Sequence, residues 1–392
     1  MVEVFIKAAM HLHFSAMPRN TYIWGFFMTA TADTQFMAYA LKLAEKGRGK
    51  TSPNPLVGAV IVKNDKVIAT GYHKAVGKDH AEISAIKNAK ESVTGATLYV
   101  NLEPCCHIGR TGPCTDALIK NKIKRVVVGI KDPNPLVNGK GIRILRKAGI
   151  EVTVNVLTDE SSYINDIYIH THTSNKPFVI LKLAQTLDGK IATLTGESKY
   201  LSCKKSLEFV HKLRSEVDAV VIGSQTALQD NPSLTVRHIK GNNPYRILLS
   251  KTLKNFESLN MIAENKDFKT IVASISSSLK KIETLDRKLI TWSIKSEKNL
   301  MDLTDFLEKA KNFNINSILC EGGSKLASSL LTQKLVDKII LITVPKIMGK
   351  GINSFSTFNA KTLDEMIIFK KHYNFILGDD SIFVGYPNWE KA

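Results

Sequence analysis

The spacing of apolar and polar positions over residues 34–175 predicts alternating helices and strands. Apolar side chains recur at helical spacing in residues 35–46 and form one inward face: Phe36, Tyr39, Ala40 and Leu43. A hairpin is expected over 57–62 and 67–70, because Asn64-Asp65 between them is a turn-forming pair. The remaining elements are helices over 79–90, 115–121 and 141–148 and strands over 96–100, 125–130 and 152–156. Helices packed on a mixed sheet follow from this order.

A second α/β region is predicted beyond a connecting helix and linker at 158–175. The pair Lys176-Pro177 marks the boundary. The predicted strands are 178–184, 219–223, 246–249, 270–273, 317–320 and 339–344, and the predicted helices are 204–216, 303–312 and 324–331. A chain of 392 residues is long enough for two or three domains. We therefore expect domains over 34–175 and 176–392.

The first 33 residues form a separate N-terminal extension that we place outside the fold. Residues 22–28 are apolar and Ala30-Thr31-Ala32 resembles a cleavage site, so a weak signal peptide is one interpretation. Translation from Met28 is the interpretation we prefer, with the upstream stretch a tail or an artefact. No stretch reaches the roughly 18 apolar residues that a membrane span needs.

Net charge and cysteine usage narrow the function classes. The formal charge is +18, but the lysines are spread along the chain rather than gathered in basic runs interleaved with aromatics. A nucleic-acid partner is therefore not expected, and a positive field suits phosphorylated small molecules. Five scattered cysteines imply no disulfide framework, which favours the cytoplasm.

One constellation of side chains predicts zinc chemistry. His80 is followed two residues later by Glu82, and Cys105 and Cys114 each follow a proline. One imidazole and two thiolates leave a tetrahedral zinc with an open fourth position, and a neighbouring carboxylate can carry protons. Zinc deaminases of nucleobase-like rings use this arrangement. We expect His80, Cys105 and Cys114 as ligands and Glu82 as the catalytic proton shuttle.

The segment Glu103–Cys114 identifies a specific resemblance. Its eight residues between the two cysteines depart from the usual P-C-x-x-C pattern, and E-P-C-C-H-x-G-R-T-x-P-C resembles the bifunctional deaminase–reductase of riboflavin biosynthesis. The similarity covers residues 34–388 and includes further motifs: Pro53-Asn54-Pro55, Gly71-Tyr72-His73, Asp132-Pro133-Asn134-Pro135, Leu187-Asp188-Gly189-Lys190, Gly196-Glu197-Ser198, Asp230-Asn231-Pro232 and Glu321-Gly322-Gly323.

The resemblance implies a fold for each half. The first half resembles a cytidine-deaminase-like three-layer α/β domain, and the second half resembles a dihydrofolate-reductase-like domain that binds NADPH. The strand–Gly-Gly–helix pattern around Glu321-Gly322-Gly323 could cradle a phosphate on free backbone N–H groups. No G-x-G-x-x-G fingerprint is present, so a Rossmann domain is not expected.

The resemblance also implies binding residues, carried over position by position. Contacts to the pyrimidine substrate are expected from Asn54, His73, His107 and Arg110 in the first domain and from Ser198, Arg214, Leu234, Arg237 and Glu321 in the second. Cofactor contacts are expected from Ala184, Tyr200, Thr226, Asp230, Gly323, Ser324, Lys325, Leu326, Ala327, Ser328 and Ser329. The chain departs from the family at Cys106, Tyr200 and Ser250-Lys251, and the last departure leaves cofactor contacts there open.

The activity implied is deamination of 2,5-diamino-6-(5-phosphoribosylamino)pyrimidin-4-one at zinc, followed by NADPH reduction of the ribosyl chain to ribityl. A homo-oligomer is also implied. Two other hypotheses stay open: a base deaminase acting on tRNA, and a non-catalytic zinc scaffold. The eight-residue spacing and the second domain disfavour the first, and Glu82 beside the ligand histidine disfavours the second.

Overall fold

The computed structural model describes residues 31–107, 112–198, 201–280, 282, 289–297 and 300–390. These residues divide into two compact units on either side of the bond between Ser174 and Asn175. Most of the expected N-terminal extension lies outside the described residues. Its last residues belong to the first helix, which Thr31 caps through its side-chain oxygen.

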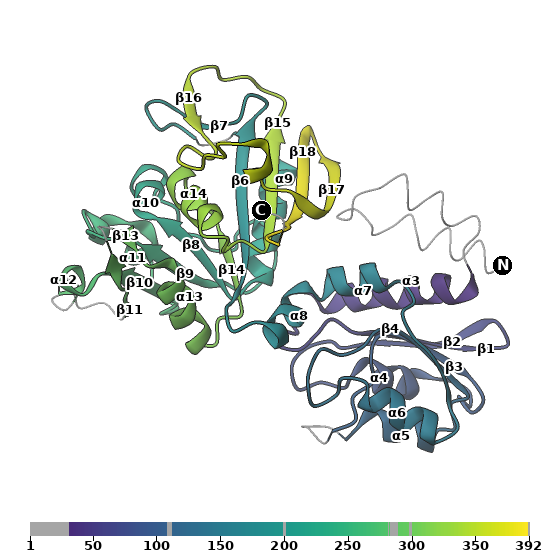
Figure 1. The fold of residues 1–392 in the computed structure, drawn as a ribbon. Helices are drawn as coiled ribbons and strands as arrows, with labels where there is room; N and C mark the ends of the chain where they lie inside the picture. The colour runs from purple at the N-terminus through teal and green to yellow at the C-terminus, as the bar shows by residue number, and fades with distance from the viewer. Residues whose placement is uncertain are drawn as a thin grey trace. The chain divides into compact units, whose positions relative to one another are not determined.

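The first unit is a five-stranded sheet with helices on both faces. Its helices are α3 (Ala32–Ala44), the short 3₁₀ turn η1 (Glu45–Gly47), α4 (Ala81–Asn88), α5 (Cys114–Lys120), α6 (Lys140–Lys147), α7 (Thr158–Ile164) and α8 (Asp166–Thr173). Its strands are β1 (Gly58–Lys63), β2 (Lys66–Tyr72), β3 (Thr97–Leu102), β4 (Arg125–Ile130) and β5 (Glu151–Thr153). Helices α3 and α7 lie on one face, and α4, α5 and α6 on the other (Figure 1).

The strand order β2-β1-β3-β4-β5 confirms the expected mixed sheet. Strand β1 runs antiparallel to both neighbours, whereas β3, β4 and β5 are parallel. The hairpin turn at Asn64 and Asp65 is also confirmed, since both residues adopt the left-handed conformation that a tight hairpin favours. Cys105 follows the carboxyl end of β3, and helices α4 and α5 pack near this end of the sheet.

Two local expectations in this unit were wrong. The helix expected over 79–90 is shorter, because α4 begins at Ala81 and its N-cap is His80. Asp79 lies before the helix, and its carboxylate accepts a hydrogen bond from Lys87 at 2.8 Å. The single connecting helix expected after residue 158 is in fact two short helices, α7 and α8, which meet at Asn165.

The second unit is built on a nine-stranded sheet. Its helices are α9 (Lys204–Glu216), α10 (Ser224–Asp230), α11 (Asn260–Ala263), α12 (Ser276–Leu279), α13 (Leu303–Asn312) and α14 (Ser324–Thr332), with 3₁₀ turns η2 (Phe256–Ser258) and η3 (Leu363–Glu365). Its strands are β6 (Phe178–Thr186), β7 (Lys190–Thr193), β8 (Ala219–Gly223), β9 (Tyr245–Leu249), β10 (Thr270–Ser274), β11 (Ile290–Ser293), β12 (Ser296–Glu297), β13 (Leu300–Met301), β14 (Ser317–Cys320), β15 (Lys338–Val344), β16 (Gly351–Asn353), β17 (Phe369–Leu377) and β18 (Asp380–Pro387).

The sheet order is β11-β10-β9-β8-β14-β6-β15-β18-β17. All neighbouring strands from β11 to β15 are parallel. The terminal hairpin of β17 and β18 is antiparallel, and β18 also runs antiparallel to β15. This hairpin was not expected from the sequence. Strand β6 lies near the centre of the sheet, between β14 and β15, although β14 begins about 130 residues after β6 ends.

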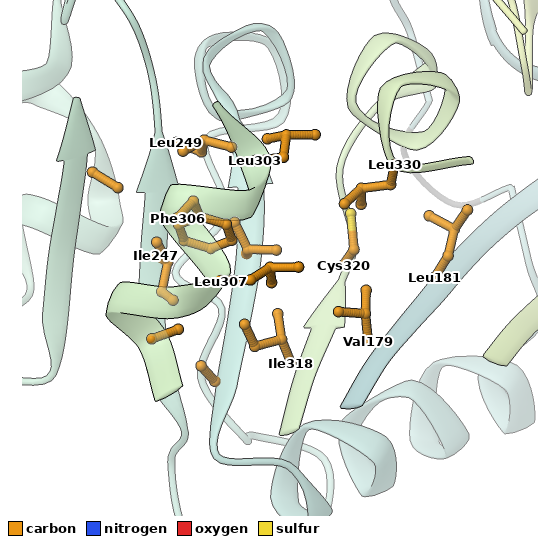
Figure 2. Packing of buried hydrophobic residues seen from close by; sticks show 14 of the residues in the cluster. Val179, Leu181, Ile247, Leu249, Leu303, Phe306, Leu307, Ile318, Cys320 and Leu330 are labelled. Carbon is orange, nitrogen blue, oxygen red and sulfur yellow. The ribbon is translucent and has the colours of Figure 1, made fainter. Parts of the chain in front are cut away.

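The core of the second unit lies between this sheet and helices α13 and α14. Figure 2 shows Phe306 and Leu307 of α13 facing Ile247 and Ile318 of the sheet. Buried residues from strands β6, β8, β9, β10 and β14 join the same cluster. Burial of these apolar side chains stabilises the parallel strands and the two helices packed on them.

Among the described residues, no helix combines the length and the apolar character that crossing a membrane requires.

Candidate functional sites

Three candidate metal ligands from separate parts of the first unit converge. His80 is the N-cap of α4, Cys105 follows β3, and Cys114 begins α5. The ligand atoms of these three residues all lie within 4.8 Å of one another. The Nδ1 atom of His80 lies 3.4 Å from the Cys105 sulfur and 3.3 Å from the Cys114 sulfur.

These residues fit a zinc ion. A tetrahedral zinc with ordinary bond lengths places a nitrogen and a sulfur ligand about 3.6 Å apart, close to the two distances here. Cys105 and Cys114 share a hydrogen bond that lowers the pKa of the Cys105 thiol and raises that of Cys114, so the pair holds its first thiolate at Cys105, beside His80. Within the described part of the chain no fourth such residue joins the group, which leaves a ligand position open. Cys106 is not in the group, and its thiol points to the Leu136 carbonyl at 3.8 Å.

Glu82 lies in the first turn of α4, two residues after His80, and only 3% of its surface is exposed. Burial, with the Cys105 thiolate nearby, raises the pKa of the Glu82 carboxyl to about 7. The carboxyl also hydrogen-bonds to the Cys114 side chain. The expected proton-carrying side chain is therefore enclosed together with two of the three candidate ligands.

Asn54 and His73 form a hydrogen-bonded pair beside the metal ligands. The Asn54 side-chain amide lies 3.1 Å from His73 Nε2, and His73 Nδ1 lies 3.1 Å from the Asp79 carbonyl. A carbonyl can only accept, so Nδ1 carries the proton and Nε2 accepts from Asn54. The His73 ring meets the His80 ring edge-on at 5.6 Å, and burial lowers the pKa of His73. A neutral, oriented imidazole thus lies against the candidate ligand His80.

His107 shows an unused polar atom. Its Nδ1 is buried and, among the described residues, has no hydrogen-bond partner. Arg110, the fourth expected substrate contact of this domain, lies outside the described residues.

Glu103 is a functional residue that sequence reasoning missed. Its buried carboxylate accepts backbone N–H groups from Asp132 (3.2 Å), Gly139 (2.8 Å) and Ile142 (3.1 Å). Two of these donors belong to the start of α6, where a carboxylate is also favoured by the helix dipole. Because Glu103 precedes Cys105 by two residues, it fixes the end of β3 that carries a candidate ligand.

In the second unit, the expected substrate residues Arg214 and Glu321 pair with each other. The Arg214 guanidinium makes two hydrogen bonds to the Glu321 carboxylate, at 2.5 and 3.1 Å, and Lys182 lies 3.7 Å from the same carboxylate. Burial alone would raise the pKa of Glu321, but Arg214 and Lys182 lower it to about 2. The Glu321 carboxylate is therefore favoured in its ionised form, chiefly by Arg214, while burial lowers the pKa of the neighbouring Lys182.

Expected substrate and cofactor residues also meet near α10. Ser198 donates to the Asp230 carboxylate at 2.6 Å. Thr226, one helical turn before Asp230, approaches Gly323 so closely that a Cβ there would lie 2.8 Å from its hydroxyl oxygen. A side chain at Gly323 would therefore require the Thr226 hydroxyl to move.

The segment Gly323–Ser329 begins at the N-cap of α14, and this confirms the strand–glycine–helix geometry. Ser324, Ala327 and Ser328 are buried, whereas Lys325 is exposed. Ser324 donates to Ser356 at 2.8 Å, so contacts of this helix with a cofactor would come mainly from its backbone. Ala184 lies half-buried on β6. Tyr200 lies outside the described residues.

Leu234 and Arg237 lie on one loop after α10. Leu234 is buried, with a left-handed backbone at φ 55°, and the Arg237 side chain is exposed. The roles of all these residues as substrate and cofactor contacts stay predictions; the structure gives their positions.

Two family models match the chain, one in each half. The model for the cytidine and deoxycytidylate deaminase zinc-binding region matches residues 30–130. The RibD C-terminal domain model matches residues 177–375. The first match includes the three candidate ligands and Glu82, and the second includes the Arg214–Glu321 pair.

Relatives match along nearly the whole chain. The riboflavin biosynthesis protein RibD of Aquifex aeolicus is 42% identical over 91% of this chain and 98% of its own length. The solved structure of Acinetobacter baumannii RibD is 32% identical, with a TM-score of 0.78 over 91% of this chain and 99% of that one. A deaminase/reductase structure from Thermotoga maritima is 36% identical, with a TM-score of 0.77 and the same coverage.

These matches favour the small-molecule function over the nucleic-acid alternative, because they extend through both units. They also account for the order of the two units, a metal centre first and a parallel-sheet domain second. The chain belongs to the RibD family of riboflavin-biosynthesis deaminase–reductases, with a zinc-binding deaminase region followed by a dihydrofolate-reductase-like reductase domain.

Proposed function

We propose that the first unit deaminates 2,5-diamino-6-(5-phosphoribosylamino)pyrimidin-4-one and that the second reduces the ribosyl chain of the product with NADPH. The Thermotoga maritima relative is described as a diaminohydroxyphosphoribosylaminopyrimidine deaminase and 5-amino-6-(5-phosphoribosylamino)uracil reductase, which supports both substrates. In the first reaction water adds to the ring carbon that bears the amino group, and ammonia leaves.

His80, Cys105 and Cys114 would hold zinc in the deaminase unit. A zinc ion there supplies Lewis acidity that lowers the pKa of water. Glu82 takes the proton that water loses and delivers it to the departing nitrogen. Asn54 would orient the ring through its side-chain amide oxygen, which its bond to His73 does not use, and His73 would hold that amide in place.

NADPH supplies the hydride for the second reaction. The Gly322-Gly323 turn and the start of α14 offer backbone N–H groups for its phosphates. Ser198, Arg214 and Arg237 would bind the sugar and its phosphate, and Arg suits a phosphate because its fork makes paired hydrogen bonds. Glu321 holds Arg214 in place and positions it.

The observation that carries the proposal is the enclosure of Glu82 with three converging ligand atoms. We would supply zinc-loaded protein with the diaminopyrimidine substrate and NADPH, and follow ammonia and NADPH together. Glu82→Gln should lower ammonia release by roughly 10²- to 10⁴-fold, the usual contribution of a general acid–base group, with zinc content unchanged.

Glu91→Gln is the matched control, because Glu91 is an exposed carboxylate just after α4. Normal ammonia release by Glu82→Gln would contradict the proton-shuttle role. Ammonia without NADPH oxidation in the unmodified protein would contradict the second half of the proposal. The homo-oligomer and the cytoplasmic location expected from the sequence stay predictions.

A further inference from the structure

A short segment, residues 234–237, is held rigidly on the second unit. It begins at Leu234, whose left-handed backbone is unusual for a leucine and persists only where the surroundings fix it. Each of the next three residues has a backbone group bonded to a side chain from elsewhere in the unit. The bonds are Arg214 Nη1 to the Thr235 carbonyl (3.2 Å), the Val236 N–H to Asn243 Oδ1 (2.9 Å) and the Arg237 N–H to His211 Nδ1 (3.1 Å).

His211 lies on α9, one helical turn before Arg214, and is 4% exposed. Since the Arg237 backbone group can only donate, His211 Nδ1 must accept, and the ring proton is on Nε2. The ring packs edge-on against His238 at 4.5 Å. One face of α9 thus contacts the segment twice, through His211 and through Arg214.

The surroundings of His211 suit an anion. Arg214, Arg237, His238 and Glu321 are the charged and titratable groups that act electrostatically on His211, and the His238 ring and the Arg237 backbone contact it directly. Arg214 and Arg237 are cations, and Glu321 is already paired with Arg214. The Arg237 side chain is exposed, with a bond of 3.3 Å from Nη1 to the neighbouring Thr235 hydroxyl. Its guanidinium is therefore accessible to a phosphate.

We infer that His211 is a positioning residue of the reductase domain: by accepting the Arg237 backbone N–H, it fixes the segment so that the Arg237 side chain meets the phosphate of the pyrimidine substrate. This inference rests on the proposed function. It adds to that function a residue that touches neither substrate nor cofactor and acts through Arg237.

The test compares His211→Leu, which removes the acceptor, with His211→Asn, whose side-chain oxygen can take the place of Nδ1. Loss of the acceptor should raise the KM for the deaminated phosphoribosyl substrate by about tenfold, with kcat and the KM for NADPH little changed. His211→Asn should restore the KM to within about twofold. His372→Leu, an exposed histidine on β17, controls for the same exchange elsewhere in the domain.

A double variant makes the test specific to Arg237. If His211 acts through Arg237, His211→Leu should add no further rise in KM on an Arg237→Ala background. The inference would be overturned if the two substitutions raised the KM additively, or if His211→Leu and His211→Asn had equal KM values. In either case, turnover by the wild-type protein would still support the proposed function. No NADPH oxidation by the wild-type protein would overturn both. If His211→Leu does not fold, the KM of His211→Asn is compared with that of Arg237→Ala. A KM of His211→Asn as high as that of Arg237→Ala would contradict the inference.

Discussion

The two sites of this chain are built in different ways. The candidate metal centre takes its ligands and its acid from 35 residues, between His80 and Cys114, and brings donor atoms to within 4.8 Å. The proposed reductase site would draw on residues from Ala184 to Ser329, and much of what it would offer is backbone at the start of α14. Metal chemistry requires particular side chains at particular places, whereas a dinucleotide can be held by peptide groups that many sequences supply.

The difference predicts that the two sites fail independently. The metal centre depends on a few side chains that other residue types cannot replace. The proposed reductase site combines backbone groups at the start of α14 with the buried Arg214–Glu321 ion pair. Variants in one unit should leave the chemistry of the other intact, and each of the following experiments measures both activities in the same protein.

The largest expected effect is at the metal centre. Cys114→Ser removes one thiolate, and ammonia release should fall by roughly a thousandfold because the remaining ligands hold zinc poorly. NADPH oxidation with the deaminated substrate should stay within twofold of the unmodified protein. Metal analysis and both assays check this. Cys203→Ser, at a half-buried cysteine of the other unit, is the control; loss of both activities in Cys114→Ser would contradict independence.

A second variant breaks the buried ion pair of the reductase site. Arg214→Met leaves Glu321 buried without its main partner, and the free energy of unfolding of this unit should fall by about 3–5 kcal/mol. Of the described tryptophans, Trp292 and Trp389 both lie in the second unit, so their fluorescence in urea follows this transition. Lys212→Met, on the same helix, should change it by less than about 0.5 kcal/mol.

Ammonia release should be unchanged in Arg214→Met. If Arg214→Met and Lys212→Met unfolded at the same urea concentration, the Arg214–Glu321 pair would contribute nothing to stability. Its role would then be in binding alone.

A third variant tests the support of the metal centre. Glu103→Gln places an amide nitrogen where three backbone N–H groups need acceptors, and should cost about 1–3 kcal/mol of stability in the first unit. Because the carboxylate fixes the strand end before Cys105, zinc should also be lost to a chelator more readily. Thermal unfolding and chelator competition measure the two effects, with Glu91→Gln as control. Unchanged zinc retention would contradict the supporting role.

The smallest expected effect is a pH dependence in the reductase unit. Burial and the neighbouring Arg214 lower the pKa of His211 to about 4. The unfolded chain therefore binds a proton below its ordinary pKa near 6.5, while the folded protein does not, and stability falls as the pH drops from about 6.5 towards 4. Urea midpoints at pH 7 and pH 5 should differ less in His211→Asn than in the unmodified protein. An equal difference would exclude His211 as the source.

The sequence was most informative where side chains do the chemistry. The spacing of His80, Glu82, Cys105 and Cys114 predicted a group that the structure brings together, because zinc restricts the residue types that can serve. The hairpin at Asn64-Asp65 was equally predictable, since few residue types tolerate the left-handed backbone of its turn. In both cases the required chemistry or conformation is local or specific enough to leave a signature.

Contacts with the peptide backbone left no such signature. The donors that bind Glu103 lie 29 to 39 residues further on, and any residue other than proline could supply them. The pairing of Arg214 with Glu321 spans 107 residues, and no local pattern indicates that these two expected substrate contacts bind each other. The hairpin of β17 and β18 was missed because its outer strand is half-exposed along its whole length.

The central position of β6 has a consequence for synthesis. Strand β6 is synthesised well before both of its partners in the sheet, because β14 and β15 come about 130 or more residues later. At roughly 5–20 residues per second, the ribosome leaves this apolar strand unpaired for on the order of ten seconds. The first unit is complete by then. Each nascent chain thus carries a fully synthesised first unit joined to an unpaired, aggregation-prone strand. Chaperones would bind the chain in this state.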